Sequence, residues 1–123
     1  MIEPKQVAVD FLTLVIAGKI DEAYSNYVDM DGKHHNVFFA AGFSVLCHAM
    51  KENDAQFARK RFTIKNVLCD GDLVVVHSHL VLKISDVGMV TFHMFRILNG
   101  KIIEMWDCGQ VIPHDLKNND GAF

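Results

Sequence analysis

Histidine is the residue type whose number and spacing first suggest chemistry in this chain. Seven histidines occur among 123 residues, and His77 and His79 flank a single serine. On a β-strand, residues two positions apart point to the same face and lie about 7 Å apart. Such a pair can bind zinc or iron when a third ligand converges, and His35, His93 or Asp107 could supply it. Because the sequence has no second compact ligand pair, we expect no metal and interpret both imidazoles as pocket or core histidines.

Asp107 has the most unusual setting of the acidic residues. It follows Trp106 in a run that we expect to be a β-strand, where carboxylates are disfavoured. Partial removal from water would raise the proton affinity of this carboxylate and suit it to general acid–base catalysis. An edge position, with Asp107 facing water or paired with Arg96, explains the pattern equally well. His93, which lies between apolar neighbours, is by itself more typical of a core histidine than of a catalyst.

The composition indicates a single globular domain over residues 1–123. Half of the residues are hydrophobic and 22% are charged, which is ordinary for a domain that buries a core. The net charge of −3 gives no electrostatic reason to expect nucleic-acid binding. No stretch approaches the length of a membrane span and no secretory leader is recognisable, so we expect no membrane association. Three widely spaced cysteines predict free thiols in a reducing compartment, and hence a cytoplasmic protein.

The first half of the chain, about residues 4–53, has the apolar spacing of helices. A turn at Asp31–Gly32 and an apolar loop over residues 34–39 interrupt this helical half. Three helices are predicted: one from Pro4 to Gly18, a short one from Asp21, and one that begins near Ser44.

The second half, about residues 61–112, changes to a pattern rich in β-branched residues, and a tail follows over 113–123. Two dipeptides, Asp70–Gly71 and Asn99–Gly100, predict two-residue hairpin turns. Helices followed by consecutive antiparallel strands are typical of an α+β domain. The predicted strands cover residues 61–69, 72–83, 88–98 and 101–112.

The position of the first turn sets the register of its hairpin. A turn at residues 70–71 places Ile64 opposite His77 and Phe62 opposite His79. We predict that the face with these four side chains is the core face.

The opposite face of the same hairpin is apolar as well, because it carries Val74 and Val76. A sheet that is apolar on both sides needs a cover on each side, and three short helices suffice for one. We therefore predict a homodimer that forms through the sheet.

A family resemblance is carried by His35–Asn36 and by residues 70–80, 95–107, 110–113 and 118–123. With these segments the chain resembles the SnoaL-like polyketide cyclase family over nearly its whole length. The resemblance is most specific in the last two hairpins and weaker over residues 1–34. It implies a cystatin-like cone shared with ketosteroid isomerase, with about three N-terminal helices packed on a curved antiparallel sheet around an open cavity, and commonly a dimer.

The resemblance also implies an enzyme that needs neither a metal nor a cofactor. In the best-known members an Asp acts as acid and base on a carbon next to a carbonyl and closes a polyketide ring by an aldol step. By position, that residue is Asp107 and its histidine partner is His93. The ligand-binding candidates are His35, Asn36, His77, His79, Trp106 and Phe39.

We therefore expect cyclisation, isomerisation or dehydration of a small, mostly apolar carbonyl compound. The alternative is a non-catalytic dimeric module that binds a small hydrophobic ligand. The chain departs from many relatives at Met105, where they have His, and at His93, where they have an acidic residue. An enzyme predicts that Asp107 points into a cavity within hydrogen-bonding reach of an imidazole, whereas a binder predicts an apolar cavity with Asp107 outside.

One conflict follows from the second turn. A regular two-residue turn at Asn99–Gly100 places Phe92, rather than His93, opposite Asp107. The resemblance pairs His93 with Asp107, so we expect a β-bulge in one of the two strands, a feature that is frequent beside active sites.

Overall fold

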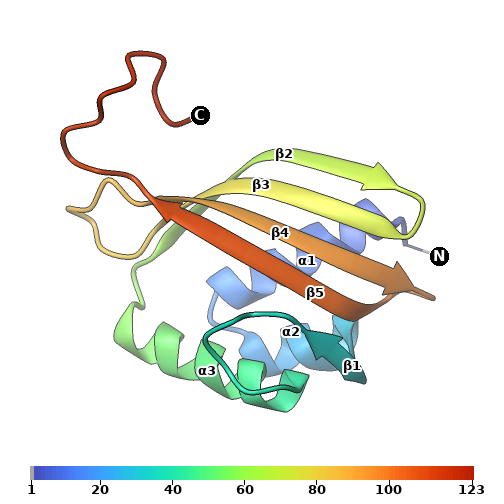
Figure 1. Ribbon diagram of the computed structural model, residues 1–123. Helices are drawn as coiled ribbons and strands as arrows, with labels where there is room; N and C mark the ends of the chain where they lie inside the picture. The colour runs from blue at the N-terminus through green and yellow to red at the C-terminus, as the bar shows by residue number, and fades with distance from the viewer. Residues whose placement is uncertain (1) are drawn as a thin grey trace.

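The computed structural model describes residues 2–123, which form three helices on one side of a curved five-stranded sheet (Figure 1). Within these residues, no helix has both the length and the hydropathy needed to cross a bilayer. The elements are α1 (Pro4–Ile16), α2 (Ile20–Tyr27), β1 (Val28–His34), α3 (Phe43–Gln56), β2 (Arg61–Asp70), β3 (Leu73–Val81), β4 (Met89–Leu98) and β5 (Lys101–Val111).

The three predicted helices form. Pro4 occupies the first turn of α1, where its missing N–H costs nothing, and the helix buries Val7 and Phe11 against the sheet. Gly18 ends this segment with a φ of 81°, in the left-handed region that favours glycine. The Phe11 ring contacts the Phe95 ring edge-on at 5.8 Å, which ties α1 to β4.

The sheet has the strand order β1-β5-β4-β3-β2, and the antiparallel meander of its last four strands confirms the expected α+β architecture. A fifth strand that was not predicted completes the sheet, because β1 pairs with β5 in parallel. The turn predicted at Asp31–Gly32 is part of that strand instead. Gly32 is needed there for close packing, since a methyl group at this position would overlap the carbonyl oxygen of Ile103.

The first hairpin turns one residue later than predicted. Its central residues are Gly71 and Asp72, Gly71 has a φ of 61°, and Asp70 pairs with Leu73. Glycine at the first central position is the pattern of a type II′ turn, which fits the sequence as well as the Asp–Gly pattern does.

The predicted core face of β3 is wrong, and a bulge in β2 is the reason. Ile64 pairs with Ser78 whereas Asn66 pairs with His77, so one extra residue turns Ile64 to the face of Ser78 rather than to that of His77. Val74, Val76 and Ser78 are fully buried under the helices. His77 and His79 consequently point outward, away from the core.

Candidate active site

The second hairpin brings His93 and Asp107 together. The Asn99–Gly100 turn forms as predicted, with Leu98 paired to Lys101. A bulge then adds one residue, Ile103, to β5. Arg96 pairs with Glu104 and its neighbour Ile97 pairs with Ile102, so Ile103 has no partner in β4. This extra residue places His93 directly opposite Asp107. Their Cβ atoms are therefore about 4.5–5.5 Å apart on the face that the helices cover.

Both side chains line a small cavity between that face and the helices. Its volume is about 50 Å³. An apolar cavity of roughly 150 Å³ is needed to hold a benzene ring, so this one admits a few waters or the reactive end of a larger molecule. Its polar side chains are Tyr24, His93 and Asp107. The rest of the wall is apolar and consists of Phe11, Leu12, Val15, Leu46, Met50 and Met105.

Asp107 lies at the mouth of this cavity and is exposed, so the expectation of a desolvated carboxylate is wrong. The side-chain amide of Asn36 donates to both of its oxygens, at 3.1 and 3.0 Å. The amide oxygen of Asn36 accepts from the backbone N–H of Phe38 at 2.9 Å, and its backbone N–H donates to the His34 ring at 3.1 Å. The loop between β1 and α3 therefore fixes the carboxylate through Asn36.

His93 contributes an unusual buried nitrogen. Its Nδ1 atom is buried and has no hydrogen-bond partner within residues 2–123. Burial lowers the pKa of His93, and the Asp107 carboxylate opposes that shift. The imidazole is thus neutral at neutral pH. A buried polar atom without a partner costs about 1–3 kcal/mol, and such exceptions call for a functional explanation.

Tyr24 is a site residue that the sequence analysis missed. It belongs to the buried face of α2, and its ring packs edge-on against Phe11 at 5.2 Å. Burial raises the pKa of the Tyr24 hydroxyl, and the Cys47 thiol and the Asp107 carboxylate raise it further. The phenol therefore stays protonated and can donate a hydrogen bond. No sequence signal marks it, because a tyrosine on the buried face of a helix is usually a core residue.

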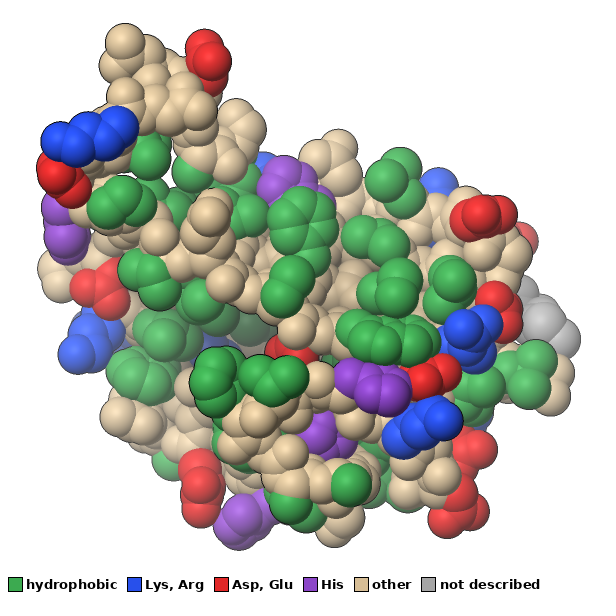
Figure 2. Space-filling view, in the orientation of Figure 1, with side chains coloured by type: hydrophobic (Ala, Val, Ile, Leu, Met, Phe, Trp, Pro, Cys, Tyr) green, Lys and Arg blue, Asp and Glu red, His purple; other side chains and the backbone are tan. Residues whose placement is uncertain are grey.

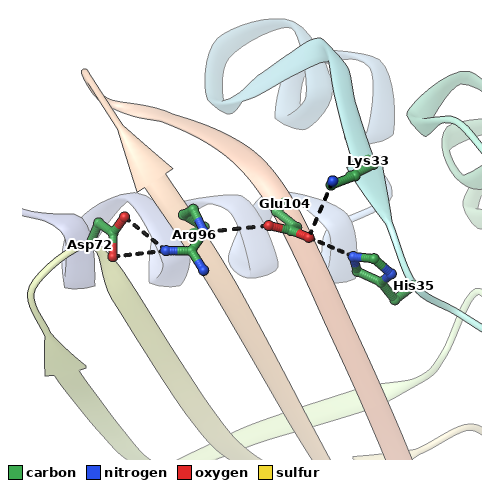
Figure 3. Close-up of polar contacts among 5 residues, drawn as sticks. All are labelled: Lys33, His35, Asp72, Arg96 and Glu104. Carbon is green, nitrogen blue, oxygen red and sulfur yellow. Dashed lines mark hydrogen bonds and ion pairs between the residues drawn. The ribbon is translucent and has the colours of Figure 1, made fainter.

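His35 and Trp106 lie on the outer face of the sheet, so the structure does not bring them to the cavity. Their rings stack at 5.0 Å, and the Nε2 atom of His35 is 2.6 Å from Glu104 (Figure 3). Glu104 also accepts from Arg96, which in turn donates to Asp72. The hydrogen bond from His35, followed by that from Arg96, lowers the pKa of Glu104.

His77 and His79 also lie on the outer face. His77 stacks on Phe92 at 4.6 Å, and the Nε2 atom of His79 donates to the carbonyl oxygen of Val87 at 2.8 Å. Neither lies near His93 or Asp107, which are on the inner face. Within residues 2–123, no three His, Cys, Asp or Glu side chains gather into a potential metal site.

Two ligand-binding candidates remain. Phe39 lies in the loop that follows β1, is 41% exposed, and does not line the cavity. Asn36 does not line it either, but it contacts Asp107 directly. Of the eight predicted site residues, the structure therefore brings together Asp107, His93 and Asn36.

Solved structures with the same architecture place the chain among known folds, although no protein-family model and no curated protein matches its sequence. Wild-type IdmH from Streptomyces antibioticus, a candidate polyketide cyclase, superposes with a TM-score of 0.73 at 17% identity, over 89% of this chain and 93% of that chain. A candidate SnoaL-like polyketide cyclase from Shewanella putrefaciens gives 0.73 at 16% identity, over 89% and 80%. An NTF2-like protein of unknown function from Cytophaga hutchinsonii gives 0.72 at 9% identity, over 89% and 92%.

Proposed function

From the SnoaL-like and NTF2-like fold of this chain, we propose that the Asp107 cavity catalyses proton transfer next to a carbonyl group. The observation that supports this most is that an exposed carboxylate and a neutral, buried imidazole occupy directly opposed positions on neighbouring strands and line one small cavity. The reaction class is aldol cyclisation, isomerisation or dehydration of a small, mostly apolar substrate.

Each polar group then has a distinct role. Asp107 takes a proton from the carbon next to the carbonyl, and electron density moves onto the carbonyl oxygen. The hydroxyl of Tyr24 and a ring N–H of His93 are the donors that stabilise the resulting enolate. Asp107 returns the proton to another carbon in an isomerisation. In a cyclisation the enolate carbon attacks a second carbonyl of the same molecule, whose oxygen becomes an alkoxide, and Asp107 returns its proton to that oxygen. Because Asn36 holds both carboxylate oxygens, it positions the base.

Deuterium exchange tests this proposal without knowledge of the natural substrate. In D₂O, the wild-type protein should speed the exchange of the protons next to the carbonyl of 2-tetralone, followed by NMR. Asp107→Asn should lose about 10²–10⁴ of that acceleration, as expected for removal of an acid–base group. Asp70→Asn, a change at the exposed end of β2, is the matched control and should keep it. Full exchange activity in Asp107→Asn would exclude the proposed role.

The second candidate function is binding of a small hydrophobic ligand without turnover. The predominance of apolar side chains in the cavity wall favours it. A binder would hold 2-tetralone by its carbonyl end, because the cavity cannot take the whole molecule. Calorimetry would detect that binding, yet no variant would exchange protons above the background rate.

We further propose that the protein is a homodimer formed through the outer face of the sheet. That face exposes Leu68 by 66% and Phe92 by 41%. Leu68 shares a cross-strand row with Met94 and Trp106, and this row lies between Phe92 and the polar network of Figure 3. Exposed apolar residues that adjoin one another in this way are typical of protein interfaces.

The cysteines support a cytoplasmic location for this dimer. Cys47, Cys69 and Cys108 are all free, and two of them are exposed. Exposed thiols persist in a reducing compartment.

A further inference from the structure

The inner face of the sheet is ordered in cross-strand rows that continue beyond the candidate site. Val76, His93 and Asp107 form one row across β3, β4 and β5. Ser78, Thr91 and Gly109 form the next, and Leu80, Met89 and Val111 form the third. Successive rows on one face are about 7 Å apart, so the third row lies roughly 14 Å from Asp107.

The third row borders a larger groove at the ends of these strands. The groove has a volume of about 330 Å³ and lies between the β3–β4 loop and the chain that leaves β5. Leu80, Met89 and Val111 line it, together with Leu82, Ile112 and Pro113. Its titratable side chains are Asp86 and His114, so its wall is mostly apolar. Figure 2 shows a hollow between the sheet and the helices that is bordered mainly by hydrophobic side chains.

The middle row separates the two spaces, and its residues are small. The hydroxyls of Ser78 and Thr91 are 2.5 Å apart, so each satisfies the other and neither is free for a ligand. Gly109 has no side chain and is exposed. Its backbone does not require glycine, because its φ lies outside the left-handed region.

The end of the Met89 side chain is the nearest group to the space above Gly109. A Cβ atom at this position would lie 2.6 Å from the Met89 Cε atom, which is the far end of a flexible side chain. The next contacts are ordinary, at 3.5 Å to the Val90 carbonyl oxygen and 3.7 Å to a Thr91 methyl carbon. Methionine adapts its shape readily, so a small movement of Met89 clears a path from the groove to Asp107.

We propose that Gly109 and Met89 form a passage through which an elongated apolar substrate reaches Asp107 with its carbonyl end, while its tail lies in the groove. This inference rests on the proposed function and adds the shape of the substrate. The Asp107 cavity is too small for a whole molecule, whereas the groove has the volume and the apolar wall that a hydrocarbon tail requires.

Chain-length dependence of binding tests the passage. The probes are 2-heptanone, 2-nonanone and 2-undecanone, and the measurement is the Kd by isothermal titration calorimetry. A buried methylene strengthens binding by up to about fourfold, so the wild-type Kd should fall by about two- to fourfold for each methylene added. Gly109→Val fills the passage and should abolish this dependence, and the smaller Gly109→Ala should give an intermediate slope.

Cys108→Val is the matched control, because it alters the neighbouring residue on the outer face of the same strand and should keep the wild-type slope. Circular dichroism identifies any variant that does not fold, and Gly109→Ala serves if Gly109→Val fails. Equal slopes in the wild type and the Gly109 variants, or no chain-length dependence in the wild type, would overturn the inference. Asp107→Asn should keep the slope. If Asp107→Asn keeps both the dependence of Kd on chain length and the wild-type rate of proton exchange, the proposed chemistry is rejected and the inference of a passage is retained.

Discussion

The Nδ2 atom of Asn36 lies 3.1 and 3.0 Å from the two carboxylate oxygens of Asp107, although 71 positions separate the two residues in the chain. One residue comes from the loop before α3 and the other from the last strand. The contact therefore joins the helical half to the sheet at the mouth of the candidate site, and it decides where the carboxylate points.

Removal of that contact should affect catalysis more than stability. In Asn36→Ala the carboxylate loses its orientation, and misplacement by about 1 Å can cost about 10²-fold in rate. The free energy of unfolding should fall by only about 0.5–1.5 kcal/mol, the net worth of a typical hydrogen bond. Deuterium exchange and urea unfolding measure the two effects. Asn66→Ala, which removes a contact to His77 on the outer face, is the control and should leave exchange unchanged.

His93 should make the stability depend on pH. Its pKa in the folded protein is below the ordinary value of 6.5, so the unfolded chain binds a proton first as the pH falls. The free energy of unfolding should therefore decrease from about pH 6.5 downward until the folded pKa is reached. His93→Phe removes this contribution, and urea unfolding at pH 7.5 and pH 5.5 should show a smaller difference than in the wild type. The control is His48→Gln on the exposed surface of α3, which should keep the pH dependence of the wild type. An unchanged pH dependence of the free energy of unfolding in His93→Phe would contradict the prediction.

Glu104 should stabilise the folded protein near neutral pH and lose this effect in acid. Its pKa is lowered from 4.5 in the folded protein, so its contribution is present above about pH 4.5 and is lost as the pH falls through the folded value. Glu104→Gln should lower the thermal midpoint at pH 7, and the difference from the wild type should be smaller at pH 3. Glu22→Gln is the control in α2. A constant difference at both pH values would show that the carboxylate charge is not the cause.

The outer face of the sheet should determine the oligomeric state. A charge at Phe92 would be buried in the proposed dimer, so Phe92→Lys should shift the protein to a monomer in sedimentation-velocity experiments. Phe38→Lys places the same charge on a side chain that is 87% exposed in a loop, and it should leave the dimer intact. A wild-type monomer at tens of micromolar would refute the dimer.

Gly32 should be intolerant of a methyl group. Gly32→Ala pushes β1 away from the bulged residue Ile103, and overpacking of this kind costs about 1–3 kcal/mol. The same bulge sets the register of His93 and Asp107, so exchange activity should fall as well. Lys33→Ala, which changes the exposed neighbour, should have little effect on the thermal midpoint or the exchange rate. Wild-type values of both in Gly32→Ala would disprove the close contact.

Local sequence signals predicted the elements correctly where a residue type had a single structural interpretation. Pro4, Gly18 and the Asn99–Gly100 turn all formed as expected, because each depends on backbone conformation within a few residues. The predictions at Gly32 and Gly71 were wrong because each glycine is compatible with two local conformations. Gly32 permits a close approach rather than a turn, and Gly71 is the first rather than the second residue of its turn.

By itself, the sequence determined the class of the fold, its three helices and four of its five strands, and it singled out Asp107 as a carboxylate within a strand. These properties follow from periodicity and from turn residues, which act over short distances. The tertiary structure alone decided which side chains face one another. One extra residue in β2 placed Ile64 on the face opposite to His77 and His79, and one extra residue in β5 turned Asp107 toward His93. Packing of α2 brought Tyr24 to the same cavity as Asp107. Side chains alternate between the faces of a strand, so a single residue of register decides which groups can meet, and long-range packing fixes that register.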